Sequence, residues 1–107
     1  RSLSKAGPDR IRTDFLRLLG APYAGKGLVL LEETHLLEAV LGFGQDQMEG
    51  EAEVAFHEFI GGIDESSLEM EGRLAKFYGS FGLDLGRQAM ETLHFDKKTK
   101  KRILAQL

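Results

Sequence analysis

The chain has 107 residues and contains no cysteine. It therefore has no disulfide framework, no thiolate metal site and no cysteine nucleophile. It also lacks any apolar run near the ~18 residues that a transmembrane helix needs, because charged residues or glycines interrupt each apolar stretch. The 42% of hydrophobic residues is ordinary for a globular protein. We expect a flexible segment over residues 1–8 and a single domain over residues 9–107.

Positive charge is missing from the middle of the chain. Residues 27–72 contain twelve Asp and Glu but no Lys or Arg. Residues 1–26 carry a net charge of +4 and residues 73–107 a net charge of +5, so the formal total of −3 conceals a strong segregation. The acidic block is a solvated face, a field that attracts metal ions, or a docking surface for a basic partner. The two basic ends are the first candidates for such a partner within the chain itself.

Apolar residues recur at helical spacing through most of the sequence. Ile11, Phe15, Leu18 and Leu19 predict a helix from residue 9, and similar patterns predict helices over 30–41 and 70–81. A short helix over 87–95 precedes a last one over 97–107, which Asp96 is placed to cap. Glycine-bearing loops separate these segments and no strand–helix alternation is present. The fold class we expect is all-α.

The loops were compared with the twelve positions of a calcium-binding helix–loop–helix. With Glu58 at position 12, residues 47–58 end in Val54-x-Phe56-x-Glu58-Phe59-Ile60, the pattern of the second half of such a loop. Residues 22–33 fit the same frame, and residues 82–93 fit it less well. On these motifs the chain resembles the EF-hand family, in the style of calmodulin and calcineurin B, over about residues 9–93.

The resemblance implies a pair of EF-hand-like units joined by a very short β bridge, residues 28–30 against 53–55. A degenerate third unit and a C-terminal helix would follow. Loops 22–33 and 82–93 lack the carboxylates that calcium needs. In loop 47–58 a neutral Gln47 and the replacement of the turn glycine by Ala52 weaken the site. We therefore expect no cofactor and no functional metal; weak Ca²⁺ binding would use Glu49, Glu51, Glu53 and Glu58.

Catalytic patterns are absent from the sequence. His35, His57 and His94 lack zinc-ligand spacing. The hydroxyls of Ser66, Ser67 and Thr92 have no base at the spacing of a known nucleophile motif. We predict that the protein is not an enzyme and has no small-molecule substrate.

The sequence thus predicts a non-catalytic protein-binding module, a structural or regulatory subunit or scaffold of a larger assembly. Two alternatives stay open: a calcium sensor that uses loop 47–58, and an adaptor that docks on acidic membrane or nucleic acid through its basic C-terminal helix. Nucleic acid is not expected as the partner, because no aromatic residues interleave with the basic cluster. The candidate partner-binding residues are an apolar set for core or groove, Phe56, Phe59, Ile60, Met70, Leu74 and Phe77, and a basic set, Lys97, Lys98, Lys100, Lys101 and Arg102.

The compartment is left open by the sequence. The chain begins at Arg1 and not at Met, as a processed product or a fragment would. A removed targeting peptide, and with it an organelle location, is one alternative.

Overall fold

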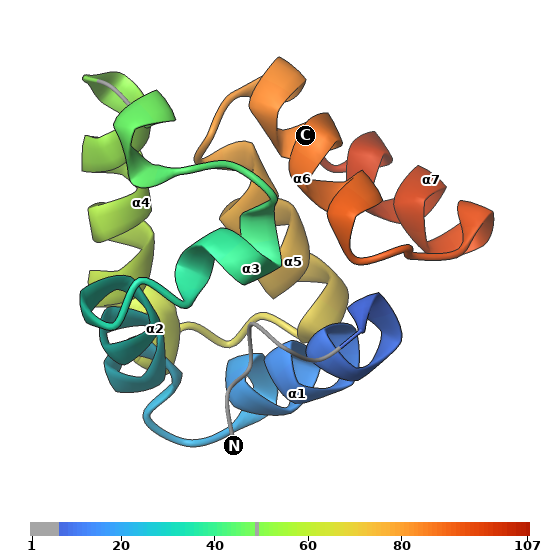
Figure 1. Ribbon diagram of the computed structural model, residues 1–107. Coiled ribbons are helices and arrows are strands. Elements are labelled where there is room, and N and C mark those ends of the chain that lie inside the picture. The colour runs from blue at the N-terminus through green and yellow to red at the C-terminus, as the bar shows by residue number, and fades with distance from the viewer. Residues whose placement is uncertain (1–6, 49) are drawn as a thin grey trace.

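The computed structural model describes residues 7–48 and 50–107, apart from the side chain of Gln45 (Figure 1). These residues form seven α-helices and two 3-10 helices, with no strand among them, so the all-α prediction is confirmed. The six residues 1–6 of the segment expected to be flexible lie outside the described part. In chain order the elements are α1 (Pro8–Gly20), α2 (Ala24–Glu33), α3 (Leu37–Leu41), η2 (Gln45–Gln47), α4 (Glu51–Gly62), η3 (Ile63–Glu65), α5 (Met70–Gly79), α6 (Leu83–Thr92) and α7 (Lys97–Ala105).

The three segments predicted to be EF-hand-like loops are mostly helical. Helices α2, α4 and α6 occupy most of residues 22–33, 47–58 and 82–93. The predicted β bridge is also wrong, because residues 28–30 lie in α2 and residues 53–55 lie in α4. The two helices do pack against each other, so the proximity was right and the local structure was not.

Helix α4 shows why the strand-like pattern misled. The apolar residues Val54 and Phe56 are two positions apart, a spacing typical of a strand, yet Val54 is 59% exposed while Phe56 is fully buried. Phe56, Phe59 and Ile63 follow one another at intervals of three and four residues. This helical spacing puts all three on one face towards the core.

Helix α2 begins six residues before the predicted start at Leu30, in spite of two glycines. Gly25 lies so close to α4 that a Cβ atom there would come within 2.7 Å of the Ile60 carbonyl oxygen. The glycine therefore permits the two helices to approach closely. The predicted helix over 30–41 is in fact the end of α2 and α3, divided at His35, whose φ is 62°.

The hydrophobic core contains residues from all seven α-helices. Phe77 of α5 stands at its centre, with the rings of Phe15, Phe56 and Tyr78 at centroid distances of 4.9, 6.0 and 4.9 Å. Such offset and edge-on ring pairs stabilise a core beyond their buried area. One core thus joins the first helix to the last, with these buried members from α1 to α7: Ile11, Leu28, Leu37, Phe56, Phe77, Met90 and Ile103.

Two arginines join helices by binding carbonyl groups at helix ends. The Arg12 guanidinium donates to the carbonyl oxygens of Leu93 and His94, at 3.0 and 2.8 Å, just after α6. Arg73 of α5 donates to the Leu19 carbonyl oxygen near the end of α1, at 2.6 Å. A cation at a helix C-terminus satisfies unpaired carbonyls and complements the helix dipole.

The helices are arranged so that α2 and α4 lie on one side of the molecule and α6 and α7 on the other (Figure 1). Helix α5 lies between them and packs on both α6 and α7. Helix α7 begins directly after Asp96, but the predicted cap is not formed, because the Asp96 side chain makes no capping hydrogen bond with any described residue. Interaction with the Thr99 side chain lowers the pKa of the Asp96 carboxyl. In the described part of the chain, no helix combines the length and apolar character needed to cross a bilayer.

Candidate functional site

The predicted apolar set lies mainly in the core. Phe56, Leu74 and Phe77 are at most 2% exposed, so they serve as core residues. Phe59, Ile60 and Met70 are partly buried and pack against that core. None of these six side chains belongs to a freely exposed apolar face.

A wide groove does run between α4, α5 and the end of α7. It encloses about 920 Å³, and Phe59, Leu68 and Leu107 line it together with polar residues such as Ser66 and Lys76. Of the predicted apolar set, Phe59 alone lines this groove. Binding of a protein partner in this groove stays a prediction.

The acidic residues predicted as weak calcium ligands are not arranged as a loop. Glu51, Glu53 and Glu58 lie along α4, and Glu49 lies outside the described residues. No group of three or more His, Asp or Glu side chains among the described residues converges as metal ligands would. His57 of α4 instead pairs with Glu32 of α2, with 2.9 Å between Nε2 and the carboxylate.

The basic C-terminal residues do form a localised surface. Lys97, Lys100 and Lys101 follow one another along α7 at intervals of three and one, and Leu104 lies one turn further on the same face. With residues of α6 they line a groove of about 570 Å³, named here the α6–α7 groove. Its complete lining is Arg87, Gln88, Met90, Glu91, Lys97, Lys100, Lys101 and Leu104.

Most of the cations in the α6–α7 groove are available to a ligand. Lys100 pairs with Glu91 across the groove, with 2.8 Å between Nζ and Oε1. Arg87, Lys97 and Lys101 are exposed and make no ion pair with any described residue. Met90, which is buried, and the half-buried Leu104 supply an apolar floor. The groove thus offers three free positive charges beside an apolar surface, an arrangement suited to an anionic ligand.

The remaining two predicted basic residues do not line this groove. Arg102 faces α5, where it forms an exposed ion pair with Glu71 at 3.4 Å. This ion pair between described side chains joins the acidic block of residues 27–72 to the basic residues 73–107. Pairing of a basic end with the acidic block, one of the alternatives left open by the sequence, is thus seen among the ion pairs of the described residues at this exposed contact, which is worth little.

Arg87 is the groove residue that the sequence interpretation missed. It lies ten positions before Lys97 and belongs to another helix, so only the packing of α6 beside α7 brings the two together. A signal was present, because Arg87 lies in the basic third of the sequence and three residues before Met90, a spacing that puts both side chains on the same side of a helix. Arg12 and Arg73 are the opposite case, since both are occupied by carbonyls of the fold.

Comparison with known protein families gives a match to the N-terminal part of the chain. A family model described as "Probable RNA and SrmB- binding site of polymerase A" matches residues 1–46, which contain α1, α2 and α3. No curated protein and no solved structure matches the chain significantly.

The family match corrects two predictions. The resemblance to the EF-hand family is wrong, because the matching family is of another kind. The expectation that nucleic acid is not a partner is also contradicted, because the description of that family names RNA. Residues 1–46 of this chain are thus similar to a family described as a probable binding site of polymerase A for RNA and SrmB.

Proposed function

We propose that this chain is a non-catalytic RNA-binding module whose α6–α7 groove contacts the phosphate backbone. The observation that carries the proposal is the match of residues 1–46 to a family described by its RNA-binding site. The three unpaired cations of the groove give that function a physical basis, because phosphate contacts supply most of the affinity of proteins for nucleic acids.

Charge distribution supports this location. The formal net charge of −3 repels RNA as a whole, so binding requires a local excess of positive charge. That excess lies on α6 and α7, while α2 and α4 with their carboxylates lie on the far side of the molecule (Figure 1). The field of the protein would therefore turn an approaching RNA towards the groove.

Three side-chain hydroxyls donate hydrogen bonds to backbone carbonyl oxygens of the fold. The Ser66 and Ser80 hydroxyls donate to the carbonyl oxygens of Ile63 and Phe77, at 2.9 and 2.6 Å. The Thr92 hydroxyl donates to the Leu41 carbonyl oxygen at 2.9 Å.

Titration of a short fluorescent single-stranded RNA, followed by anisotropy, tests the proposal. Three phosphate contacts predict a plot of log K against log salt with a slope of about −2. The triple variant Arg87→Gln, Lys97→Gln, Lys101→Gln should weaken binding by about tenfold or more at low salt and flatten the slope. Circular dichroism checks that the helices remain.

Two single variants form a matched pair. Lys101→Gln should weaken RNA binding, whereas Lys76→Gln, which neutralises a lysine that is also exposed but lies on α5, should not. Absence of RNA binding by the wild-type chain would overturn the proposal. An equal loss of RNA affinity in the two variants would show that the α6–α7 groove is not the RNA-binding surface. Groove-dependent binding to phosphatidylglycerol vesicles that exceeds binding to RNA would assign the groove to membranes instead.

A further inference from the structure

We infer that Tyr23 is a stacking platform for an unpaired RNA base, with Lys26 beside it to contact the adjoining phosphate. This inference rests on the proposed function and specifies that the RNA recognised is single-stranded. Tyr23 and Lys26 lie within the matched residues 1–46 and at the start of α2, away from the groove-forming helices α6 and α7 in the fold.

Exposure sets Tyr23 apart from the other aromatic residues. The sequence has seven Phe and two Tyr, and the other eight rings are buried or half-buried in the core. Tyr23 is 76% exposed, the largest exposed fraction among the large hydrophobic side chains of the described residues. An aromatic ring left in solvent contributes nothing to the core, whereas it gives a nucleobase a flat surface for stacking.

The backbone at Tyr23 is also costly. Its φ of 64° and ψ of 33° place a bulky residue in the left-handed region, where glycine is favoured. His35 and His94 share a positive φ, but they follow the ends of α2 and α6, where a left-handed residue is the usual helix stop. Tyr23 instead precedes a helix, and its carbonyl oxygen accepts the first bond of α2 from the Gly27 N–H at 3.2 Å.

The packing of the next two residues holds the ring outward. Ala24 is 1% exposed, and Gly25 is buried against the Ile60 carbonyl. The Gly25 N–H donates to the Asp64 carboxylate at 3.2 Å, so an internal anion already occupies this helix terminus. A phosphate next to the stacked base would therefore be bound by a side chain. Lys26, exposed and without an ion pair among the described residues, is in the first turn of α2.

Strain and exposure together indicate selection for something other than stability. Glycine at position 23 would remove the backbone strain and the exposed ring at once. Tyr23→Gly should therefore raise the melting temperature while it lowers affinity for single-stranded RNA by about tenfold. Tyr23→Phe keeps the ring and should retain affinity. A purely structural role of Tyr23 would produce the opposite change in stability.

A fluorescent variant tests stacking directly. Because the chain has no Trp, the emission of a Tyr23→Trp variant comes from a single site. Short single-stranded RNA should quench it, and the same RNA annealed to its complement should quench it much less. Val54→Trp, at a position 59% exposed on acidic α4, is the matched control and should not respond.

The outcomes separate the two proposals. If the wild-type chain binds no RNA, the proposed function fails and this inference with it. If the groove variants lose RNA while Tyr23→Gly binds it as the wild type does, the groove stands and the stacking role is overturned. Equal quenching by duplex and single strand would also overturn it.

Discussion

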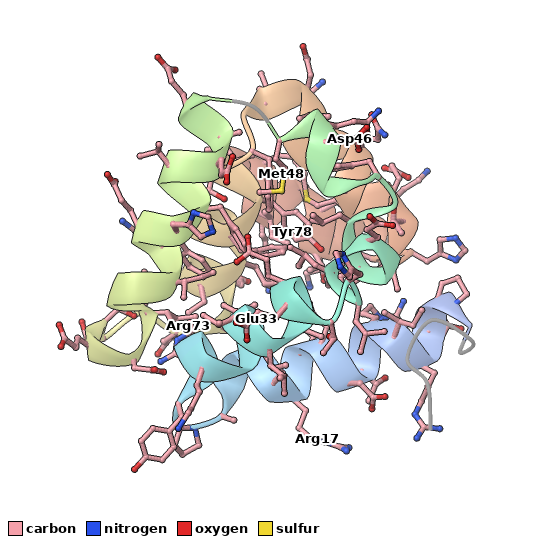
Figure 2. All side chains as sticks on the ribbon, turned by 60° about the vertical axis from the view of Figure 1, so that its left-hand side comes forward. Arg17, Glu33, Asp46, Met48, Arg73 and Tyr78 are labelled. Atoms are coloured by element: carbon pink, nitrogen blue, oxygen red, sulfur yellow. The ribbon has the colours of Figure 1, made fainter. Side chains whose placement is uncertain are left out.

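At the scale of single residues, the Tyr78 hydroxyl is the most unusual group in the core. Tyr78 is fully buried between Phe77 and Phe95, and Figure 2 shows it in the interior, whereas Arg17 points away from α1. Its oxygen is buried without a hydrogen-bond partner among the described residues. A buried hydroxyl with no partner loses its water bonds without replacement. Burial also raises the pKa of Tyr78 well above its usual range.

Removing this hydroxyl should stabilise the protein. Tyr78→Phe keeps the ring contacts, and we expect the free energy of unfolding at neutral pH to rise by about 1 kcal/mol. In the wild type the folded state keeps Tyr78 protonated, while the unfolded state releases the proton above the ordinary pKa of 10.0. The contribution of Tyr78 to the free energy of unfolding should therefore be constant below pH 10 and decrease as the pH rises above 10. The decrease should be smaller in the Tyr78→Phe variant, which has no phenol to ionise at this position. Urea denaturation at several pH values measures both, and a less stable variant would show that the hydroxyl has a partner.

Arg12 gives a second prediction at this scale. Its two bonds to the carbonyls after α6 involve a charged donor that is 28% exposed, so Arg12→Gln should cost about 2 kcal/mol of unfolding free energy. Arg10→Gln is the matched control on the same helix. Arg10 is 53% exposed and, among the described side chains, pairs with Asp14 one turn away, so its loss should change stability by about 0.5 kcal/mol or less. Similar effects in chemical denaturation would contradict the role given to Arg12.

At the scale of the elements, close approach of helices decides where glycine is required. A Cβ atom at Gly86 of α6 would come within 2.6 Å of the Tyr78 carbonyl oxygen of α5. A backbone atom cannot move aside without moving its helix. Gly86 therefore sets the α5–α6 distance, and through it the position of the helix that carries Arg87.

Alanine substitutions should separate this glycine from an ordinary one. Gly86→Ala should destabilise the protein by about 1–3 kcal/mol, because it overpacks the contact. Gly61→Ala, in α4 with open space around the new methyl group, should stabilise it by up to ~1 kcal/mol through better helix propensity. Melting curves of the two variants provide the test, and a gain from both would mean that α5 and α6 can separate at no cost.

The elements also show how far sequence reasoning extends. Helices α1 and α7 were predicted nearly to the residue, because each has an apolar stripe and a clear start. The sequence interpretation of α4 was wrong because the apolar pair Val54 and Phe56 has strand spacing inside a longer helical pattern. The start of α2 was predicted six residues too late, because Gly25 and Gly27 are residue types that usually interrupt a helix. The close contact of Gly25 with α4 explains why a glycine is tolerated inside this helix.

The candidate site was predictable in part for the same reason. Lys97, Lys100 and Lys101 adjoin in sequence and were identified as a binding surface. Arg87 required knowledge of which helix packs beside α7. Nucleic acid was rejected because aromatic residues were sought within the basic cluster, whereas the exposed ring of Tyr23 belongs to a distant part of the chain.

At the scale of the whole molecule, acidic α4 and the basic α6–α7 groove lie on opposite sides (Figure 1). The variant Glu51→Gln, Glu53→Gln, Glu58→Gln removes three charges far from the groove. It should speed association with RNA by a few-fold at low salt, through weaker long-range repulsion. Stopped-flow mixing measures the rate. The gain should vanish at high salt, and a gain that persists there would indicate that α4 contacts RNA itself.

The bond from Arg12 to the end of α6 has a consequence for the segment that matches the polymerase family. Within residues 1–46, Ile11, Phe15 and Leu19 turn their apolar stripe towards a core that is completed by residues after position 46. A chain cut after residue 46 would expose the apolar side chains of α1 to solvent. It would also lack the carbonyl oxygens of Leu93 and His94, to which Arg12 donates. The matched residues 8–46 thus depend for their core packing on later residues, and the excised segment should aggregate where the intact chain does not.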